Sequence, residues 1–105
     1  MASSRGYLEF VLEQLAELDG ITYRSMMGEY ILYFRGKIAA YICDDRLLVK
    51  PVKVAISLMP EAIYEAPYEG AKEMLLVEDV DDREFLVKLF TEMYDELPMP
   101  KRKKK

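Results

Sequence analysis

The sequence predicts an α+β domain in which an antiparallel sheet of about five strands packs against helices, in the order α-β-β-β-β-α-β-α. Two segments with helical spacing of apolar residues lie near residues 7–18 and 85–93, and between them residues 21–50 are rich in β-branched and aromatic residues. The length of 105 residues suits one domain. We therefore expect a single domain over residues 1–96, followed by a disordered basic tail over residues 97–105.

The first helix is predicted over residues 7–18. Its apolar residues recur at a spacing of three or four and form one face: Leu8, Val11, Leu12, Leu15 and Leu18. Gly20 then ends the helix, because glycine tolerates the left-handed conformation that closes many helices. The apolar face needs a sheet to cover.

Residues 21–50 predict four short strands joined by hairpins, as an antiparallel meander. We place the strands near residues 22–27, 30–34, 37–43 and 47–50. Asp44 and Asp45 could be imagined as paired catalytic carboxylates. A tight turn is the better interpretation, because aspartate tolerates left-handed geometry and bonds nearby backbone groups.

The second half of the chain predicts a short helix, a strand and a final helix. Pro51 suits the first turn of the short helix, and Pro60 stops it. Residues 61–73 are interpreted as a loop with brief extension near residues 63–66, and residues 74–78 as a buried strand.

Acidic residues precede the final helix, and Asp81 or Asp82 can cap it. Residues 78–82 superficially resemble a calcium loop. Arg83 stands at the third ligand position counted from Asp79, and no glycine follows it. Helix capping is therefore the preferred role, and the helix ends before Pro98.

The chain contains no histidine and one cysteine, Cys43. It therefore lacks the commonest general base at neutral pH and the commonest zinc ligand. One cysteine also excludes an intramolecular disulfide, and no phosphate-binding glycine loop is present. We expect no enzyme activity, no cofactor and no metal, with Cys43 a buried small hydrophobe in the reducing cytoplasm. No apolar run is long enough to span a membrane.

The charge is unevenly distributed. The net charge is −4, and five basic residues occupy positions 101–105, so residues 1–100 carry −4 − 5 = −9. An acidic body repels phosphate backbones, so direct binding of duplex DNA is not expected. Tyr30, Tyr33 and Tyr41 could instead form a stacking platform for a small ligand or a single-stranded nucleic acid. Core packing and cross-strand pairing explain the same residues and are preferred.

The segment from Arg24 to Tyr33, followed by residues 36–50, resembles the N-terminal domain of the TfoX family of competence regulators. The family pattern has a leading helix ending in glycine, an Arg-x-Met-Phe-Gly-Gly-like hairpin that ends in Leu-Tyr, and an Asp-Asp-x-Leu-x-x-Lys turn and strand. The residues that fit are Arg24, Met26, Gly28, Leu32, Tyr33, Ala39, Asp44, Asp45, Leu47 and Lys50. Tyr64, Glu65, Gly70 and Met74 resemble later features of the pattern.

Three positions depart from the family pattern: Met27 stands for Phe, and Glu29 and Ile31 stand for Gly. The resemblance implies an α+β domain without known catalytic activity, which in full-length members precedes a helical C-terminal domain. On this basis we expect a stand-alone version without the second half, and a direct promoter-binding role is not carried over.

These observations predict a non-catalytic regulatory or protein-interaction module with a protein partner, and a homodimer is the general prior. The alternative is the ligand or single-strand binder above. Arg24 is expected on a half-buried strand, paired with Glu29, with an acid of the final helix or with a partner. The predicted interaction site comprises Arg24, Met27, Gly28, Tyr30, Tyr33 and Lys50.

Overall fold

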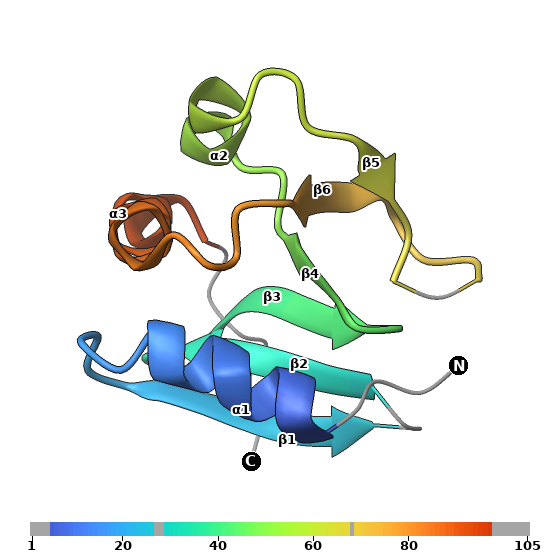
Figure 1. The fold of residues 1–105 in the computed structure, drawn as a ribbon. Helices are drawn as coiled ribbons and strands as arrows, with labels where there is room; N and C mark the ends of the chain where they lie inside the picture. The colour runs from blue at the N-terminus through green and yellow to red at the C-terminus, as the bar shows by residue number, and fades with distance from the viewer. Residues whose placement is uncertain (1–4, 27–28, 68, 98–105) are drawn as a thin grey trace, which may run out of the picture.

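The computed structural model describes residues 5–26, 29–67 and 69–97 (Figure 1). It confirms the predicted α+β class, with helices packed against one antiparallel sheet. The sheet has six strands, because the brief extension expected near residues 63–66 is itself a strand. In chain order the elements are α1 (Arg5–Gln14), β1 (Ile21–Met26), β2 (Glu29–Phe34), β3 (Lys37–Cys43), β4 (Arg46–Val49), α2 (Lys53–Leu58), β5 (Tyr64–Glu65), β6 (Met74–Val77), α3 (Arg83–Met93) and the short 3₁₀ helix η1 (Tyr94–Glu96).

The strands lie in the order β1-β2-β3-β4-β6-β5, and every neighbouring pair is antiparallel. Strands β1 to β4 form the predicted meander, and β6 joins it beside β4 after the chain has passed through α2 and β5. Figure 1 shows α1 lying along β1 and β2, with α2 and α3 towards the β4 and β6 side of the sheet. Strands β1 and β5 are the two edges.

Two-residue turns join the central hairpins. Arg35 and Gly36 between β2 and β3, and Asp44 and Asp45 between β3 and β4, all have positive φ angles, between 53° and 87°. Such turns match the twist of the strands that they connect. The interpretation of Asp44 and Asp45 as turn residues is therefore confirmed.

Gly20 is the point at which the chain passes from the first helix into the sheet. Regular helix ends at Gln14, and turns continue to Gly20, which has a φ of +89°. Its carbonyl accepts a hydrogen bond of 2.8 Å from the backbone N–H of Arg35. A Cβ atom there would lie 2.7 Å from Cγ of Arg35, so both the backbone angle and the close approach require glycine.

The main core lies between the sheet and the helices. All three helices contribute to it, through residues such as Leu8 of α1, Ala55 of α2 and Phe90 of α3. Leu97 is also buried in this core, so the folded region extends at least one residue beyond the expected boundary at 96. The remainder of the predicted basic tail, residues 98–105, lies outside the described residues.

Side-chain hydrogen bonds connect the helices to each other and to the loops. Asp82 caps α3, because its carboxylate accepts from the N–H of Phe85 at 3.1 Å, as predicted for one of the two aspartates. Val52 provides no such cap for α2, and Glu96 instead accepts from the N–H of Val54 at 2.8 Å. None of the described helices is long and apolar enough to cross a membrane.

Candidate functional site

One face of the sheet carries no helix in the described part of the chain, and we call it the open face. Side chains alternate between the two faces of a strand, and residues paired across strands share a face. The register, which shifts by one residue at a β-bulge in β3 opposite Leu32 and Tyr33, therefore places nine apolar residues on the open face: Met26, Ile31, Tyr33, Ile38, Tyr41, Cys43, Leu48, Met74 and Leu76.

A continuous row of side chains crosses this face. Ile31 pairs with Tyr41, Tyr41 pairs with Leu48, and Leu48 pairs with Leu76. Arg24 pairs with Ile31 and ends the row at the β1 edge. An apolar row four strands wide is unusual for a solvated face, because antiparallel sheets with one covered face normally direct polar residues outward.

The open face is partly covered by its own loop. Cys43, Leu48 and Met74 are buried in a second, small cluster, against which Tyr41 and Leu76 pack. Pro67 and Ala71, from the loop before β6, line a hollow of about 270 Å³ together with Tyr41 and Lys50. Tyr33, Ile38, Tyr41 and Leu76 remain half-buried and therefore accessible.

The predicted site residues divide between two surfaces. Arg24 and Tyr33 lie on the open face, and Lys50 lies at its margin beside Tyr41. Tyr30 lies on the helix-covered face, where its ring contacts Tyr23 edge-on with 5.9 Å between centroids. Met27 and Gly28 lie outside the described residues.

The alternative of a stacking platform formed by Tyr30, Tyr33 and Tyr41 is not assembled in the structure. Tyr30 and Tyr33 are three residues apart on one strand, and an odd separation directs them to opposite faces of the sheet. Only Tyr33 and Tyr41 share the open face, so the stacking surface on which the alternative function depended is reduced to two rings.

The expected half-buried position of Arg24 is wrong. Arg24 is exposed, and it makes no ion pair with Glu29 or with an acid of α3 within the described residues. The physical reason is that β1 is an edge strand with one neighbour and no helix on this face. The Glu29 carboxylate is instead an acceptor for the backbone N–H of Asp44, at 3.2 Å.

The half-buried arginine on this face, with internal ion pairs, is Arg46. Its guanidinium forms an ion pair with Glu65, and this pair links β4 to β5. It also pairs with Asp44 at 3.4 Å. Its Nε atom is buried and has no hydrogen-bond partner among the described residues. Arg46 therefore has an internal ion pair of the kind that the sequence predicts for Arg24.

We expect the substitution Arg24→Ala to change the free energy of unfolding by no more than about 0.5 kcal/mol, because an exposed side chain without an internal partner contributes little. Arg46→Ala is the matched control and should cost about 1–3 kcal/mol, since it leaves Glu65 without its partner. Denaturant unfolding of both variants measures the difference. Equal losses would contradict the assignment.

The Cys43 thiol lies among charged groups at the turn end of the open face. Burial raises its pKa above the ordinary value, and the negative charge of Glu29 acts in the same direction, while Arg46 opposes them. The thiol is 3% exposed. It is therefore held as the neutral, unreactive form, in agreement with the sequence interpretation of a buried hydrophobe.

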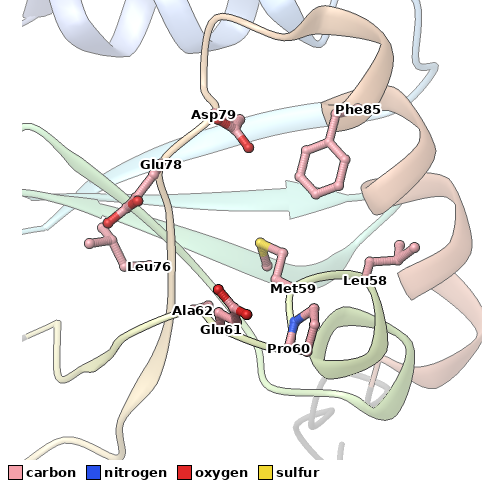
Figure 2. Close-up of a pocket in the computed structure, with 9 residues that line it drawn as sticks. All are labelled: Leu58, Met59, Pro60, Glu61, Ala62, Leu76, Glu78, Asp79 and Phe85. Carbon is pink, nitrogen blue, oxygen red and sulfur yellow. The ribbon is translucent and has the colours of Figure 1, made fainter.

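A second surface feature lies where α2 ends, and we call it the α2 groove. Figure 2 shows the Met59 sulfur and the Phe85 ring at its centre, with the carboxylates of Asp79 and Glu61 on opposite sides. The groove has a volume of about 330 Å³. Its lining residues are Leu58, Met59, Pro60, Glu61, Ala62, Leu76, Glu78, Asp79 and Phe85.

Neither surface has the arrangement of a metal centre. Within residues 5–26, 29–67 and 69–97, no three histidine, cysteine, aspartate or glutamate side chains gather in a way that could hold a metal ion. The acidic residues of the α2 groove line an opening rather than converge on one point.

Sequence reasoning missed most of the open face and the whole α2 groove. A signal for the open face was present, because β2 and β3 are apolar at consecutive positions and not only at alternate ones, as in Ile31-Leu32 and Ala40-Tyr41. No comparable signal marks the groove, whose lining comes from α2, β6 and α3 and is assembled only by the fold.

Comparison with known proteins gives one family and one relative. The TfoX N-terminal domain family matches residues 13–95. A 12.7 kDa protein of Spirochaeta aurantia, described as uncharacterized and located in the trpE 5′ region, is 32% identical over 80 residues, which cover 76% of this chain and 70% of that protein. No solved structure matches the chain significantly.

Proposed function

Because this chain belongs to the TfoX N-terminal domain family, we propose that it acts as a non-catalytic regulatory module that binds another protein through its open face. The family supports a module like those of competence regulators. The protein partner and the surface are inferred from the arrangement of side chains.

The observation that carries the proposal is the apolar row from Ile31 to Leu76. Leu48 in this row is fully buried and Ile31 is 7% exposed, yet Tyr33, Ile38 and Tyr41 around them remain half-buried on the open side. The half-buried set Tyr33, Ile38, Tyr41 and Leu76, in and beside this row, therefore reaches solvent, and neighbouring apolar side chains at the surface of a folded domain can mark an interaction site. Tyrosine is also among the residues enriched at the energetic centre of interfaces.

The charge favours a protein over a nucleic acid. The net charge is −4, and Arg46, at the turn end of the face, is engaged in ion pairs with Glu65 and Asp44. Arg24 and Lys50 stand at its margins, where rim charges usually steer a partner rather than supply affinity. A phosphate backbone would need several such cations together.

The test compares two tyrosines on opposite faces of neighbouring strands. Tyr33→Thr removes a ring from the open face, and Tyr23→Thr removes one from the other face. Threonine, like tyrosine, is favoured in β-strands, so each substitution keeps the strand preference of its position. With the full chain as bait in extract of the source cells, we expect Tyr33→Thr to lose a partner that Tyr23→Thr retains, and titration of the purified partner should show binding weakened about tenfold or more.

Other results would point elsewhere. Equal capture by both variants would exclude the open face as the binding surface. Self-association that disappears only in Tyr33→Thr, measured by sedimentation, would show that the face joins two copies of the chain. A nucleotide, metabolite or single-stranded oligonucleotide could instead raise the melting temperature of the wild type but not of Tyr33→Thr. That result would identify the ligand of the open face as this molecule and not a protein.

A further inference from the structure

The α2 groove combines an apolar floor with an acidic rim. Met59 and Phe85 form the centre, and Leu58 extends the floor along α2. Glu61 comes from the segment after α2, and Glu78 comes from the segment after β6. None of the described residues that line the groove is basic.

The rim carboxylates take part in none of the ion pairs in the part of the chain that the structure describes. Within the described residues, the ion pairs are formed by Arg5 and Arg46, and none reaches Glu61, Glu78 or Asp79. All three are exposed, so their charges face the opening. An anionic ligand would be repelled from three sides, whereas a cation would be attracted.

The apolar floor determines which kind of cation fits. A bare metal ion needs converging oxygen ligands and gains nothing from Met59 or Phe85. A lysine or arginine side chain has an apolar stem that can lie on these two residues, and its charged end can interact with the aromatic ring and reach the rim. The combination of floor and rim therefore matches a basic side chain.

Apolar residues that adjoin the groove lining in the chain are exposed, and they favour a protein segment as the source of the cation. Ile56, Ile63 and Tyr64 are 40%, 54% and 46% exposed. They flank the lining residues in the chain, on α2 and at the start of β5. A free amine would leave these side chains in water, whereas a peptide that places a basic residue in the groove can cover them with its neighbouring apolar residues.

We propose that the α2 groove binds a lysine or arginine side chain of a protein segment in which apolar residues flank the basic one. Phe85 and Met59 receive the stem, and Glu61, Glu78 and Asp79 bind the charged end. The groove shares Leu76 with the apolar row of the open face, but Met59, Phe85 and the three rim carboxylates lie outside that row, so the inference does not depend on the proposed function.

The probe is the peptide acetyl-Leu-Lys-Ile-Arg-Leu-amide, titrated into the ¹⁵N-labelled full chain and followed by NMR. Shifts are expected at the amides of Met59, Glu61 and Phe85. A matched peptide with norleucine for lysine and citrulline for arginine should bind at least about fivefold more weakly, because it keeps the apolar contacts and loses the charge. Raising the salt concentration should weaken only the charged peptide.

The double substitution Glu78→Gln and Asp79→Asn should weaken binding of the charged peptide by a similar factor. Glu13→Gln with Glu17→Gln, on exposed positions of the first helix and its following turn, makes the same change in net charge and should leave the affinity unaltered. Thermal unfolding of each variant verifies that it is folded.

Several results would overturn the proposal. Equal affinity for the two peptides would show an apolar groove without charge recognition, and equal loss in the two double variants would show only attraction to an acidic body. If the NMR shift changes were confined to residues of the open face, the peptide would bind that surface and not the α2 groove. If binding appeared only when Lys103, Lys104 and Lys105 were all replaced by glutamine in the full chain, the occupant would be this protein's own basic segment.

Discussion

Phe90→Ala is expected to lower the free energy of unfolding by about 3–5 kcal/mol, the largest effect of any single substitution considered for this protein. Phe90 is fully buried on α3, inside the core that all three helices share with the sheet. Its removal loses the transfer free energy of the ring and leaves a cavity that the surrounding helices and strands can only partly fill. Domains of this size have total stabilities of about 5–15 kcal/mol, so a substantial fraction would be lost.

Phe10→Ala is the matched control, since it makes the same chemical change on another helix. Phe10 lies on α1 and is 38% exposed, so its truncation should cost about 1 kcal/mol or less. Denaturant unfolding or thermal melting of both variants gives the comparison, and the Phe90 variant should melt on the order of 10–20 °C lower than the wild type. Similar losses at the two positions would show that α3 does not pack on the sheet as described.

Cys43 is expected to react with a thiol reagent in the folded protein at least about a thousandfold more slowly than in the unfolded chain. The side chain is 3% exposed, so the reagent must wait for the sheet around it to open. An opening free energy of about 4 kcal/mol gives this factor. Because Cys43 is the only cysteine, the labelling rate reports on this position alone.

An exposed cysteine elsewhere in the sheet provides the control. The double variant Cys43→Ala with Tyr23→Cys places a thiol on the edge strand β1, where the native side chain is 37% exposed. It should react nearly as fast in the folded as in the unfolded state. If Cys43 in the folded protein reacted within about tenfold of the unfolded rate, the small cluster around Leu48 would have to be open to solvent.

The raised pKa of the Cys43 thiol also gives a pH dependence with a definite sign. Burial favours the neutral thiol in the folded state, so the stabilising effect is fully present below the unfolded pKa and is lost as pH rises through the folded pKa. The wild type should therefore lose more stability than Cys43→Ala as the pH rises above the ordinary thiol pKa of about 8.5. Unfolding curves of the two proteins across this range measure it, and parallel losses would contradict it.

Much of the fold could be predicted because its signals are local. The turns at Arg35-Gly36 and Asp44-Asp45 require positive φ angles that few residues tolerate, and Asp82 caps α3 through a bond to a backbone group three residues away. The strands of the meander are consecutive, so their order follows from their succession along the chain. These features depend on residues close together in the sequence, so they can be recognised without the tertiary structure.

The candidate site was harder to predict from the sequence, because its features depend on contacts between distant segments. Arg24 looked half-buried because apolar residues surround it in sequence, but burial of a strand residue depends on whether its strand is central and which face the helices cover. β1 is an edge strand, and all three helices pack on the other face. The basic residue with buried contacts is Arg46, whose partner Glu65 lies nineteen positions away.

By itself the sequence determined the α+β class, the meander, the turn positions, the cap of α3 and the family. The tertiary structure alone decided that β6 inserts between β4 and β5 and that Glu96 caps α2. It also decided that Tyr30 lies on the helix-covered face of the sheet and Tyr33 on the open face. Periodicity of two shows that a strand has two faces. Where both faces are apolar, as at Ile31 and Leu32, only the packing of distant helices determines which one remains open.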